Sequence, residues 1–349
     1  MKAVGYTRSL PVGDPESLID IELPQPIASG RDLLVKVEAI AVNPVDYKIR
    51  QRVAPEEGYK VIGWDAVGDV VATGEAVTQF KPGDNVYYAG DLNRQGCNAE
   101  YQLVDERIVG TKPGSLSDAE AAALPLTTIT AWELLFEHLA IKQRLPGPEP
   151  GSDEKSDEVM LVIGAAGGVG SILIQIAKAI TGATIIATAS RESSRAWVKQ
   201  LGADHVIDHT RPLREQIDAL IEGAGIGQIT HIASLNGTGA YFESYPELLA
   251  PFGKIAMIDD PGAPLDVMKL KLKSQSLHIE FMFARSMFNA ADMDEQSKLL
   301  NRVADLVDQG YIQTTLGKNL GTINAENLKA AHAELESGKA IGKIVMEGF

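Results

Sequence analysis

Cysteine is almost absent from this 349-residue sequence, in which Cys97 is the only one. A single thiol excludes an intramolecular disulfide and every zinc site that needs several cysteines. Histidine is also scarce, because the chain has six and none precedes His138. Asp46 and Asp65 could supply oxygen ligands, but two carboxylates without a softer third ligand bind zinc poorly. We therefore expect chemistry that uses no metal.

Long apolar runs and basic clusters are absent as well. No segment approaches the roughly 18 apolar residues of a membrane-spanning helix, and the first residues lack the apolar core and cleavage site of a signal peptide. The net charge is −15, and no run of Lys and Arg offsets it. We expect a cytoplasmic protein that binds neither membranes nor nucleic acid and that acts on a small molecule.

What the chain does contain is typical of an α/β protein with two domains. Residues 1–125 hold short β-rich runs separated by Gly, Pro and Asp, which indicate a barrel-like β domain. Ser117 is a candidate N-cap for the first strong helical signal. Residues 143–158 are rich in Pro, Gly and charge and predict an exposed loop.

From residue 159 onwards, apolar strand-like runs alternate with helical segments. The strands are expected at 159–163, 184–189, 206–207, 231–235 and 254–258, with a last strand at 278–283. Helices are expected between them, including one near 213–222 and one near 241–250. This alternation predicts a doubly wound parallel sheet with helices on both faces. Residues 296–349 return to helix, turn and strand.

A glycine-rich turn joins the strand at 159–163 to a helix that is expected at 169–180. Its members are Gly164, Ala165, Ala166, Gly167, Gly168, Val169 and Gly170. Small residues let backbone N–H groups approach a pyrophosphate at the positive end of the helix. Because strand, turn and helix are in register, we expect a dinucleotide here, although Ala165 departs from a strict G-x-G-x-x-G spacing.

The end of the second strand indicates which dinucleotide binds. NAD-specific sites usually place a carboxylate there to accept from the ribose hydroxyls. This chain has Ser190 and Arg191 instead, and a hydroxyl with a guanidinium suits the 2′-phosphate of NADPH. Two alternatives stay open, because Arg191 could be a solvated surface residue and Glu192 could serve NADH.

Several further motifs extend over nearly the whole chain. They are Ala41–Lys48, Gly63–Gly68, Phe80–Val86, Asn98–Tyr101, Val104–Arg107, Leu126–Trp132 and Gly338–Val345. With the glycine turn, they resemble the quinone oxidoreductase branch of the medium-chain dehydrogenase/reductase superfamily, and in particular the zinc-type alcohol dehydrogenase-like proteins. The resemblance implies a GroES-like β-barrel catalytic domain of residues 1–128 and 284–349 and a Rossmann NADP-binding domain of residues 129–283.

The same resemblance implies which residues form the site. Zinc-dependent relatives carry Cys where Asn43 stands and Gly-His-Glu at residues 63–65. By resemblance, Asn43 faces the nicotinamide and the substrate, Asp46 supports its loop, and Tyr47 or Lys48 donates a proton or hydrogen bond. Further cofactor contacts are expected from three more residues: Thr130, Leu235 and Phe283. Simpler roles remain open: a tight turn at Asn43 and Asp46, packing for Tyr47 and Phe283, and a helix N-cap at Thr130.

Hydride transfer places negative charge on the substrate oxygen, and a zinc enzyme stabilises it with the metal. A quinone or an α,β-unsaturated carbonyl spreads this charge, so a few hydrogen-bond donors suffice. We therefore expect an NADPH-dependent quinone or enone reductase. The alternatives are an NADPH-binding structural or regulatory protein with little turnover and a zinc-dependent alcohol dehydrogenase. A homodimer is expected through the apolar edge strand at 278–283, where relatives dimerise.

Overall fold

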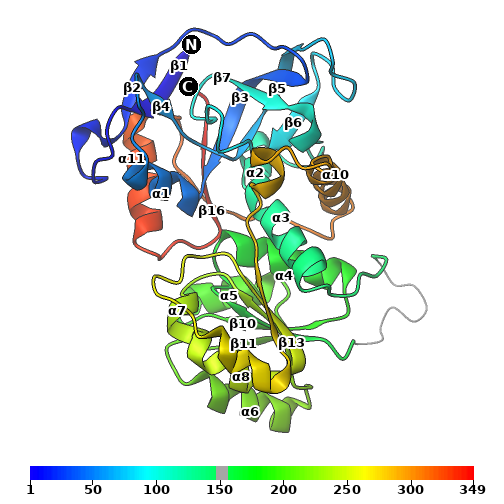
Figure 1. Cartoon of the computed structure of the whole chain (residues 1–349). Helices are drawn as coiled ribbons and strands as arrows, with labels where there is room; N and C mark the ends of the chain where they lie inside the picture. The colour runs from blue at the N-terminus through cyan, green and yellow to red at the C-terminus, as the bar shows by residue number, and fades with distance from the viewer. Residues whose placement is uncertain (147–155) are drawn as a thin grey trace. The chain divides into compact units, whose positions relative to one another are not determined.

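The computed structural model describes residues 1–146 and 156–349, which form two compact units (Figure 1). The first unit is Met1–Ile129 with Met282–Phe349, and the second is Thr130–Phe281. Most of the loop predicted at 143–158 lies outside the described residues. Among the helices of the described ranges, none combines the length and the apolar character that crossing a membrane requires.

The first unit is built on a mostly antiparallel seven-stranded sheet. The strand order is β15-β16-β3-β5-β6-β8, and β7 also pairs with β3. These strands are β3 (Asp32–Val42), β5 (Ala66–Thr73), β6 (Asn85–Tyr88), β7 (Tyr101–Asp105), β8 (Val109–Thr111), β15 (Leu316–Asn319) and β16 (Lys343–Glu347). A smaller sheet has the order β2-β1-β4, from Ile19–Glu22, Lys2–Tyr6 and Lys60–Val61. β3 lies in the middle of this sheet, and its long apolar run is buried along most of its length.

The first unit also contains helices, some of which contact this sheet. They are α1 (Pro44–Arg52), α2 (Asp118–Ala122), α9 (Ala284–Met287), α10 (Glu295–Asp308) and α11 (Ala325–Glu336), while α3 (Pro125–Trp132) begins in this unit and ends in the next. The predicted N-cap is confirmed, because the Ser117 side chain accepts from the backbone N–H of Glu120 and Glu120 reciprocates. Helix α2 contacts β3, so this cap fixes the start of a helix that packs against the sheet.

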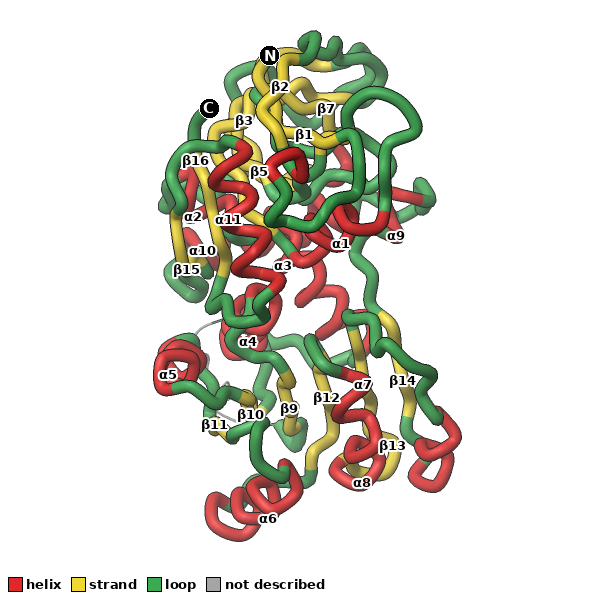
Figure 2. Tube along the Cα trace, turned by 90° about the vertical axis from the view of Figure 1, so that its left-hand side faces the viewer, coloured by secondary structure: helices red, strands yellow, loops and turns green. Residues whose placement is uncertain are grey.

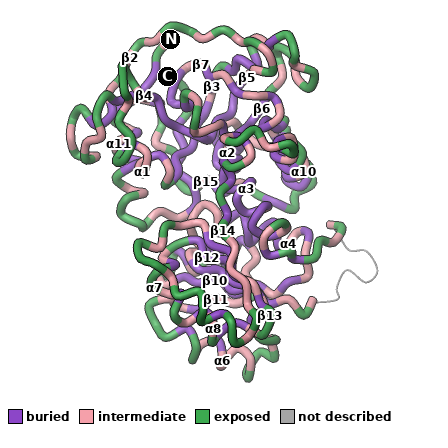
Figure 3. The backbone as a smooth tube through the Cα atoms, viewed as in Figure 1, coloured by how far each residue is buried: buried purple, intermediate pink, exposed green. Residues whose placement is uncertain are grey.

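The second unit is the expected parallel sheet, with strand order β11-β10-β9-β12-β13-β14. Its strands are β9 (Val159–Ile163), β10 (Thr184–Thr188), β11 (His205–Ile207), β12 (Ile229–Ser234), β13 (Leu249–Met257) and β14 (Ser276–Ile279). Its helices are α4 (Gly168–Ile180), α5 (Glu192–Gln200), α6 (Leu213–Ala224), α7 (Thr238–Tyr241) and α8 (Tyr245–Leu248). Figure 2 shows α5 and α6 by β11 and α8 by β13, which they contact. The middle strands are buried (Figure 3).

Two expected elements differ from the structure. The helix near 241–250 is interrupted and ends at Leu248, because Pro246 fits only the first turn of a helix and starts α8. The last strand ends at Ile279 rather than at residue 283. Glu280 follows it with its carboxylate buried and 2.8 Å from His138 Nε2, so a buried polar side chain breaks the apolar run.

Candidate active site

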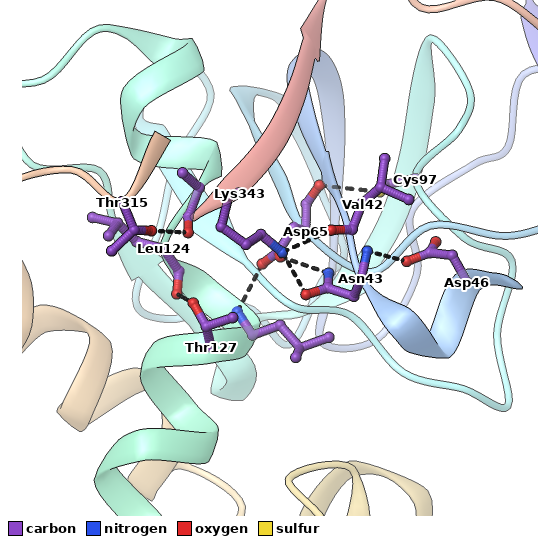
Figure 4. Close-up of polar contacts among 11 residues, drawn as sticks. Val42, Asn43, Asp46, Asp65, Cys97, Leu124, Thr127, Thr315 and Lys343 are labelled. Atoms are coloured by element: carbon purple, nitrogen blue, oxygen red, sulfur yellow. Dashed lines mark hydrogen bonds and ion pairs between the residues drawn. The ribbon is translucent and has the colours of Figure 1, made fainter. Parts of the chain in front are cut away.

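A buried polar cluster lies where three neighbouring strands of the first unit meet (Figure 4). β3 ends at Val42, directly before Asn43. Register pairs Val42 with Ile344, so Lys343 at the start of β16 lies beside Asn43. On the other side of β3, Ile40 pairs with Ala66, which places Asp65 next to the same point. Strand pairing alone thus gathers a lysine, an aspartate and an asparagine.

Hydrogen bonds use almost every polar atom of this cluster. Asp65 Oδ2 accepts from Lys343 Nζ at 2.8 Å and from Asn43 Nδ2 at 2.7 Å, while Oδ1 accepts from the Leu126 N–H at 2.7 Å. Lys343 Nζ also donates to Asn43 Oδ1 and to the Val42 carbonyl. Asn43 is 1% exposed. Its amide is therefore held by this ion pair rather than presented at the surface of the unit.

Asp46 lies on the other side of Asn43 and caps α1. Its Oδ2 accepts from the Asn43 backbone N–H at 2.7 Å, which satisfies an N–H group at the start of the helix. Burial raises the pKa of Asp46 to about 7, although this hydrogen bond acts in the opposite direction. Burial likewise raises the pKa of Asp65, against the effect of the Lys343 ammonium. Asp46 thus holds the backbone at the start of α1.

The next residues, Tyr47 and Lys48, lie on α1 and are half-buried. Asp46 and Arg50 are one helical turn apart and face inward, so Tyr47 and Lys48 lie towards the sides of the helix. The C-terminal end of α1 is fixed by the Tyr6 hydroxyl, which donates to the Val53 carbonyl at 2.7 Å. Helix α1 therefore holds both candidate donors on a backbone that is fixed at each end.

Arg50 also joins α1 to α11. Its side chain is buried, donates from Nε to His332 Nδ1 at 3.2 Å and pairs with Glu336. Burial and then the nearby guanidinium lower the pKa of His332 from its ordinary 6.5 to about 3. His332 therefore accepts this hydrogen bond as a neutral imidazole.

This histidine should make the fold sensitive to acid. Between pH 6.5 and about 3 the unfolded chain takes up a proton at His332 and the folded chain does not. The free energy of unfolding should therefore fall by about 1.4 kcal/mol per pH unit below 6.5 through this group alone. His332→Gln keeps an acceptor for Arg50 without titrating. Urea unfolding at several pH values should give a flatter profile for this variant than for wild type, and parallel profiles would contradict the assignment.

The second unit carries the glycine turn at the carboxyl end of β9. Gly164 has φ +80°, a conformation that other residues rarely adopt, and Gly167 is the N-cap of α4. Gly170 packs so closely that a Cβ atom there would lie 2.4 Å from the carbonyl oxygen of Ala165. The sheet order reverses between β9 and β12, and ligands of such sheets bind at this point. Helix α4 begins at Gly168, one residue before the expected start.

Other predicted cofactor residues gather at the same edge of the sheet. The Gly164 N–H donates to Thr188 Oγ1 at 3.1 Å, and Ser190 and Arg191 lie two and three residues after this last residue of β10. Leu235 follows β12, and its N–H donates to the Ile163 carbonyl at 3.1 Å. The structure therefore brings the glycine turn, the end of β10 and Leu235 together within one unit.

Two predicted cofactor residues lie elsewhere. Thr130 is buried within α3 and is the first residue of the second unit, so it is not the helix N-cap considered as its alternative. Phe283 belongs to the first unit, where it is buried and contacts Trp64 edge to face, with ring centroids 6.2 Å apart. Packing thus accounts for the ring of Phe283.

Lys343 is the site residue that sequence reasoning did not single out. In the sequence it is visible only as a single lysine directly before the apolar run Ile344–Met346. Such a lysine usually marks the exposed end of a strand. Here it is 3% exposed. Only the pairing of β16 with β3 shows what its charge contacts.

Comparison with known proteins identifies the family of the chain. Residues 29–127 match the alcohol dehydrogenase GroES-like domain, and residues 168–300 match the zinc-binding dehydrogenase model. A zinc-type alcohol dehydrogenase-like protein of Staphylococcus epidermidis is 38% identical over 99% of each chain. The chain belongs to the medium-chain dehydrogenase/reductase superfamily. The resemblance drawn from the sequence is confirmed, and so is the combination of a GroES-like domain with a Rossmann-like domain.

Other medium-chain dehydrogenase/reductase proteins share the whole architecture. A putative zinc-dependent alcohol dehydrogenase from Rhizobium etli is 52% identical, with a TM-score of 0.92 over 100% of this chain and 98% of that one. A mycobacterial protein solved with NADPH is 27% identical, with a TM-score of 0.81 over 99% and 100%. A chloroplastic quinone-oxidoreductase homolog of Spinacia oleracea is 28% identical over 96% and 95%. This chain is therefore an oxidoreductase of the superfamily.

The cluster around Lys343 contains Asn43 and Asp65. By the resemblance drawn from the sequence, zinc-dependent relatives carry a cysteine at the position of Asn43 and a histidine and a glutamate at the positions of Trp64 and Asp65. The oxygen atoms of Asn43 and Asp65 already accept from the Lys343 ammonium. Across residues 1–146 and 156–349, no three His, Cys, Asp or Glu side chains form a group suited to a metal ion.

Proposed function

We propose that this chain is an NADPH-dependent reductase that transfers hydride to a quinone or an α,β-unsaturated carbonyl compound without zinc. The observation that carries the proposal is the buried Lys343–Asp65–Asn43 cluster at the zinc-ligand positions. A fixed ammonium among these oxygen atoms repels a divalent cation, so the Lewis-acid role of zinc is not available there. Among carbonyl compounds, conjugated acceptors need a Lewis acid least, because they spread the developing negative charge.

The choice of NADPH rests on the second unit. The glycine turn fits a pyrophosphate. Gly164 adopts a positive φ that permits the turn, and Gly170 has no side chain where the backbone of Ala165 packs against it. Ser190 and Arg191 follow β10 and would hold the 2′-phosphate, while Glu192 is exposed in the first turn of α5. When bound, NADPH supplies the hydride. The mycobacterial relative that was solved with NADPH supports the same choice.

The residues of the first unit would act on the acceptor through hydrogen bonds. Asn43 is buried with both ends of its amide engaged, so we assign it the role of fixing the start of α1. Tyr47 and Lys48, half-buried on that helix, are the residues proposed to donate to the oxygen on which charge develops. The quinone-oxidoreductase homolog of Spinacia oleracea supports the class of acceptor.

The decisive experiment is a steady-state assay of purified, metal-analysed protein. Oxidation of NADPH and NADH is followed by absorbance with ortho- and para-quinones, linear enones and simple aldehydes, with and without a chelator. We expect turnover of quinones or enones with NADPH that a chelator does not reduce. Stoichiometric zinc with loss of activity on chelation would establish the zinc enzyme instead. Tight NADPH binding with no turnover of any acceptor would establish a cofactor-binding protein.

We also propose that the protein is a homodimer through β14. Among the described residues this strand pairs only with β13, so its other edge presents backbone donors and acceptors. Large apolar side chains near it are exposed: Val267, Met268, Leu272, Ile279 and Phe281. A second copy that pairs along this edge would cover them.

The dimer predicts a sharp effect of charge at the edge. Ile279→Arg should convert the protein to a monomer, because a buried guanidinium without a partner costs several kcal/mol. Ile27→Arg is the matched control, since Ile27 is also exposed but belongs to the first unit. Light scattering with size-exclusion chromatography measures the mass. A wild-type monomer, or a dimer that survives Ile279→Arg, would contradict the proposal.

A further inference from the structure

A chain of hydrogen bonds joins four polar side chains at the carboxyl ends of β12 and β13. Register pairs Ser234 with Met257, so the two strand ends lie side by side. The Ser234 hydroxyl oxygen lies 2.7 Å from both the Tyr245 hydroxyl and Thr238 Oγ1. Asp259 Oδ1 accepts from Thr238 Oγ1, and Asp259 Oδ2 accepts from the Thr238 backbone N–H at 3.0 Å. The three hydroxyl-bearing residues are fully buried.

The carboxylate at one end fixes the direction of this chain. A carboxylate only accepts, so Thr238 gives its hydroxyl hydrogen to Asp259. Thr238 Oγ1 is then free to accept from Ser234, and Ser234 Oγ accepts from Tyr245. Burial raises the pKa of Tyr245, which keeps this first donor protonated. Hydrogen bonds that point one way polarise one another, so the loss of one hydroxyl weakens the whole chain.

The loop of residues 235–237 is held between this chain and the glycine turn. Ser234 precedes the loop and Thr238 follows it, so the hydrogen bond between their hydroxyls closes the loop at its base. On the other side, a Cβ atom at Gly164 would lie 3.2 Å from Asn236 Cβ, so the loop packs against the glycine turn. The position of the loop therefore depends on both contacts.

This loop stands where the nicotinamide half of NADPH would pass. In a sheet of this kind the two halves of a dinucleotide lie on either side of the switch point, with the pyrophosphate between them. We assign the pyrophosphate to the glycine turn after β9 and the 2′-phosphate to the end of β10. The other half then extends over the ends of β12 and β13, on the opposite side of β9.

We propose that Thr238 is a positioning residue for hydride transfer, which rests on the proposed function. Its hydroxyl and its N–H join the loop 235–237 to Asp259, and the loop in turn supports the nicotinamide ring. Thr238 thus acts through the loop and not by contact with the reacting atoms. A displaced loop leaves the pyrophosphate site intact but misaligns the ring. Loss of the hydroxyl should therefore slow hydride transfer more than it weakens NADPH binding.

Single-turnover oxidation of NADPH by the whole protein tests this role. The acceptor is a para-quinone or a linear enone, whichever wild type reduces. Thr238→Val should slow the reaction about tenfold or more, because a small misplacement of a reacting group costs much of the rate. The NADPH dissociation constant should change less than about threefold, since the glycine turn is untouched. Thr238→Ser keeps the hydroxyl and should restore the rate to within about twofold of wild type.

Thr230→Val is the matched control, because it removes a hydroxyl from the same strand at its amino end. Thr230 Oγ1 accepts from the Val159 N–H at 2.9 Å and donates to the Val159 carbonyl at 3.1 Å. Its loss should lower the free energy of unfolding, because a backbone N–H then lacks its partner. The single-turnover rate should stay that of wild type, since Thr230 is remote from the cofactor edge of the sheet.

Four results would overturn the role of Thr238 and leave the proposed function intact. They are a wild-type rate in Thr238→Val, equal slowing in Thr230→Val and Thr238→Val, no recovery in Thr238→Ser, and a wild-type rate in Tyr245→Phe. The last variant removes one hydroxyl from the other end of the chain and keeps the ring, so it decides the matter if Thr238→Val does not fold. A wild-type protein that oxidises NADPH with neither acceptor would overturn the proposed function together with this inference.

Discussion

Replacing Lys343 with methionine is expected to lower the free energy of unfolding by about 3–5 kcal/mol, because it leaves a buried carboxylate without its counter-ion. The side chains of Lys343 and Asp65 are 3% and 0% exposed, and their charged atoms are 2.8 Å apart. The carboxylate would retain only the donors from Asn43 and Leu126. Urea denaturation at neutral pH measures the effect.

Two further variants make this result specific. Lys318→Met is the matched control, because Lys318 pairs with Glu334 on the surface and its loss should change stability by less than about 1 kcal/mol. Adding Asp65→Asn to Lys343→Met removes the unpaired charge and should restore most of the lost stability. If Lys343→Met and Lys318→Met lowered the free energy of unfolding equally, the buried pair of Lys343 and Asp65 would contribute no more to stability than a surface ion pair.

Gly170→Ala is expected to weaken NADPH binding by about tenfold or more, equivalent to at least about 1.4 kcal/mol. The added Cβ atom would lie 2.4 Å from the backbone carbonyl of Ala165, so the glycine turn must move away from the start of α4. Overpacking of this kind should also reduce the free energy of unfolding by about 1–3 kcal/mol. Titration of the cofactor and urea denaturation measure the two effects.

Gly223→Ala is the control for that substitution. Gly223 lies in α6, and a Cβ atom there would meet no heavy atom within 4 Å. Alanine at this position should stabilise the helix by about 0.5–1 kcal/mol and leave NADPH binding unchanged. Wild-type affinity in Gly170→Ala would show that close packing of the turn does not shape the cofactor site.

The sequence predicted the second unit well because its signals are local. A buried strand, a turn of small residues and a helix follow one another from Val159 to Ile180, so their order in the chain reveals the edge where they lie. Ser190 and Arg191 could be placed by the same reasoning, since they follow the neighbouring strand. The strand expected at 278–283 ends early, at Ile279, for a non-local reason, because Glu280 hydrogen-bonds with His138, which lies far away in the sequence.

The polar cluster could not be predicted in the same way. Asn43 and Lys343 are 300 residues apart, and only the pairing of β3 with β16 makes them neighbours. Resemblance placed Asn43 at the site and explained the missing zinc ligands. The structure adds that its amide is fixed by an ion pair, which no local pattern around Asn43 reveals.

The insertion of one unit into the other also orders the folding of the chain. Residues 130–281 form a continuous unit, whereas β3 must wait for β16, which is made after that whole unit. During synthesis the second unit can fold alone, while residues 39–42 of β3 lack their partner strand β16. Non-local pairing of this kind is slow, because a long loop must close before the contacts form. The nascent first unit is therefore the part of this protein that most needs protection from aggregation.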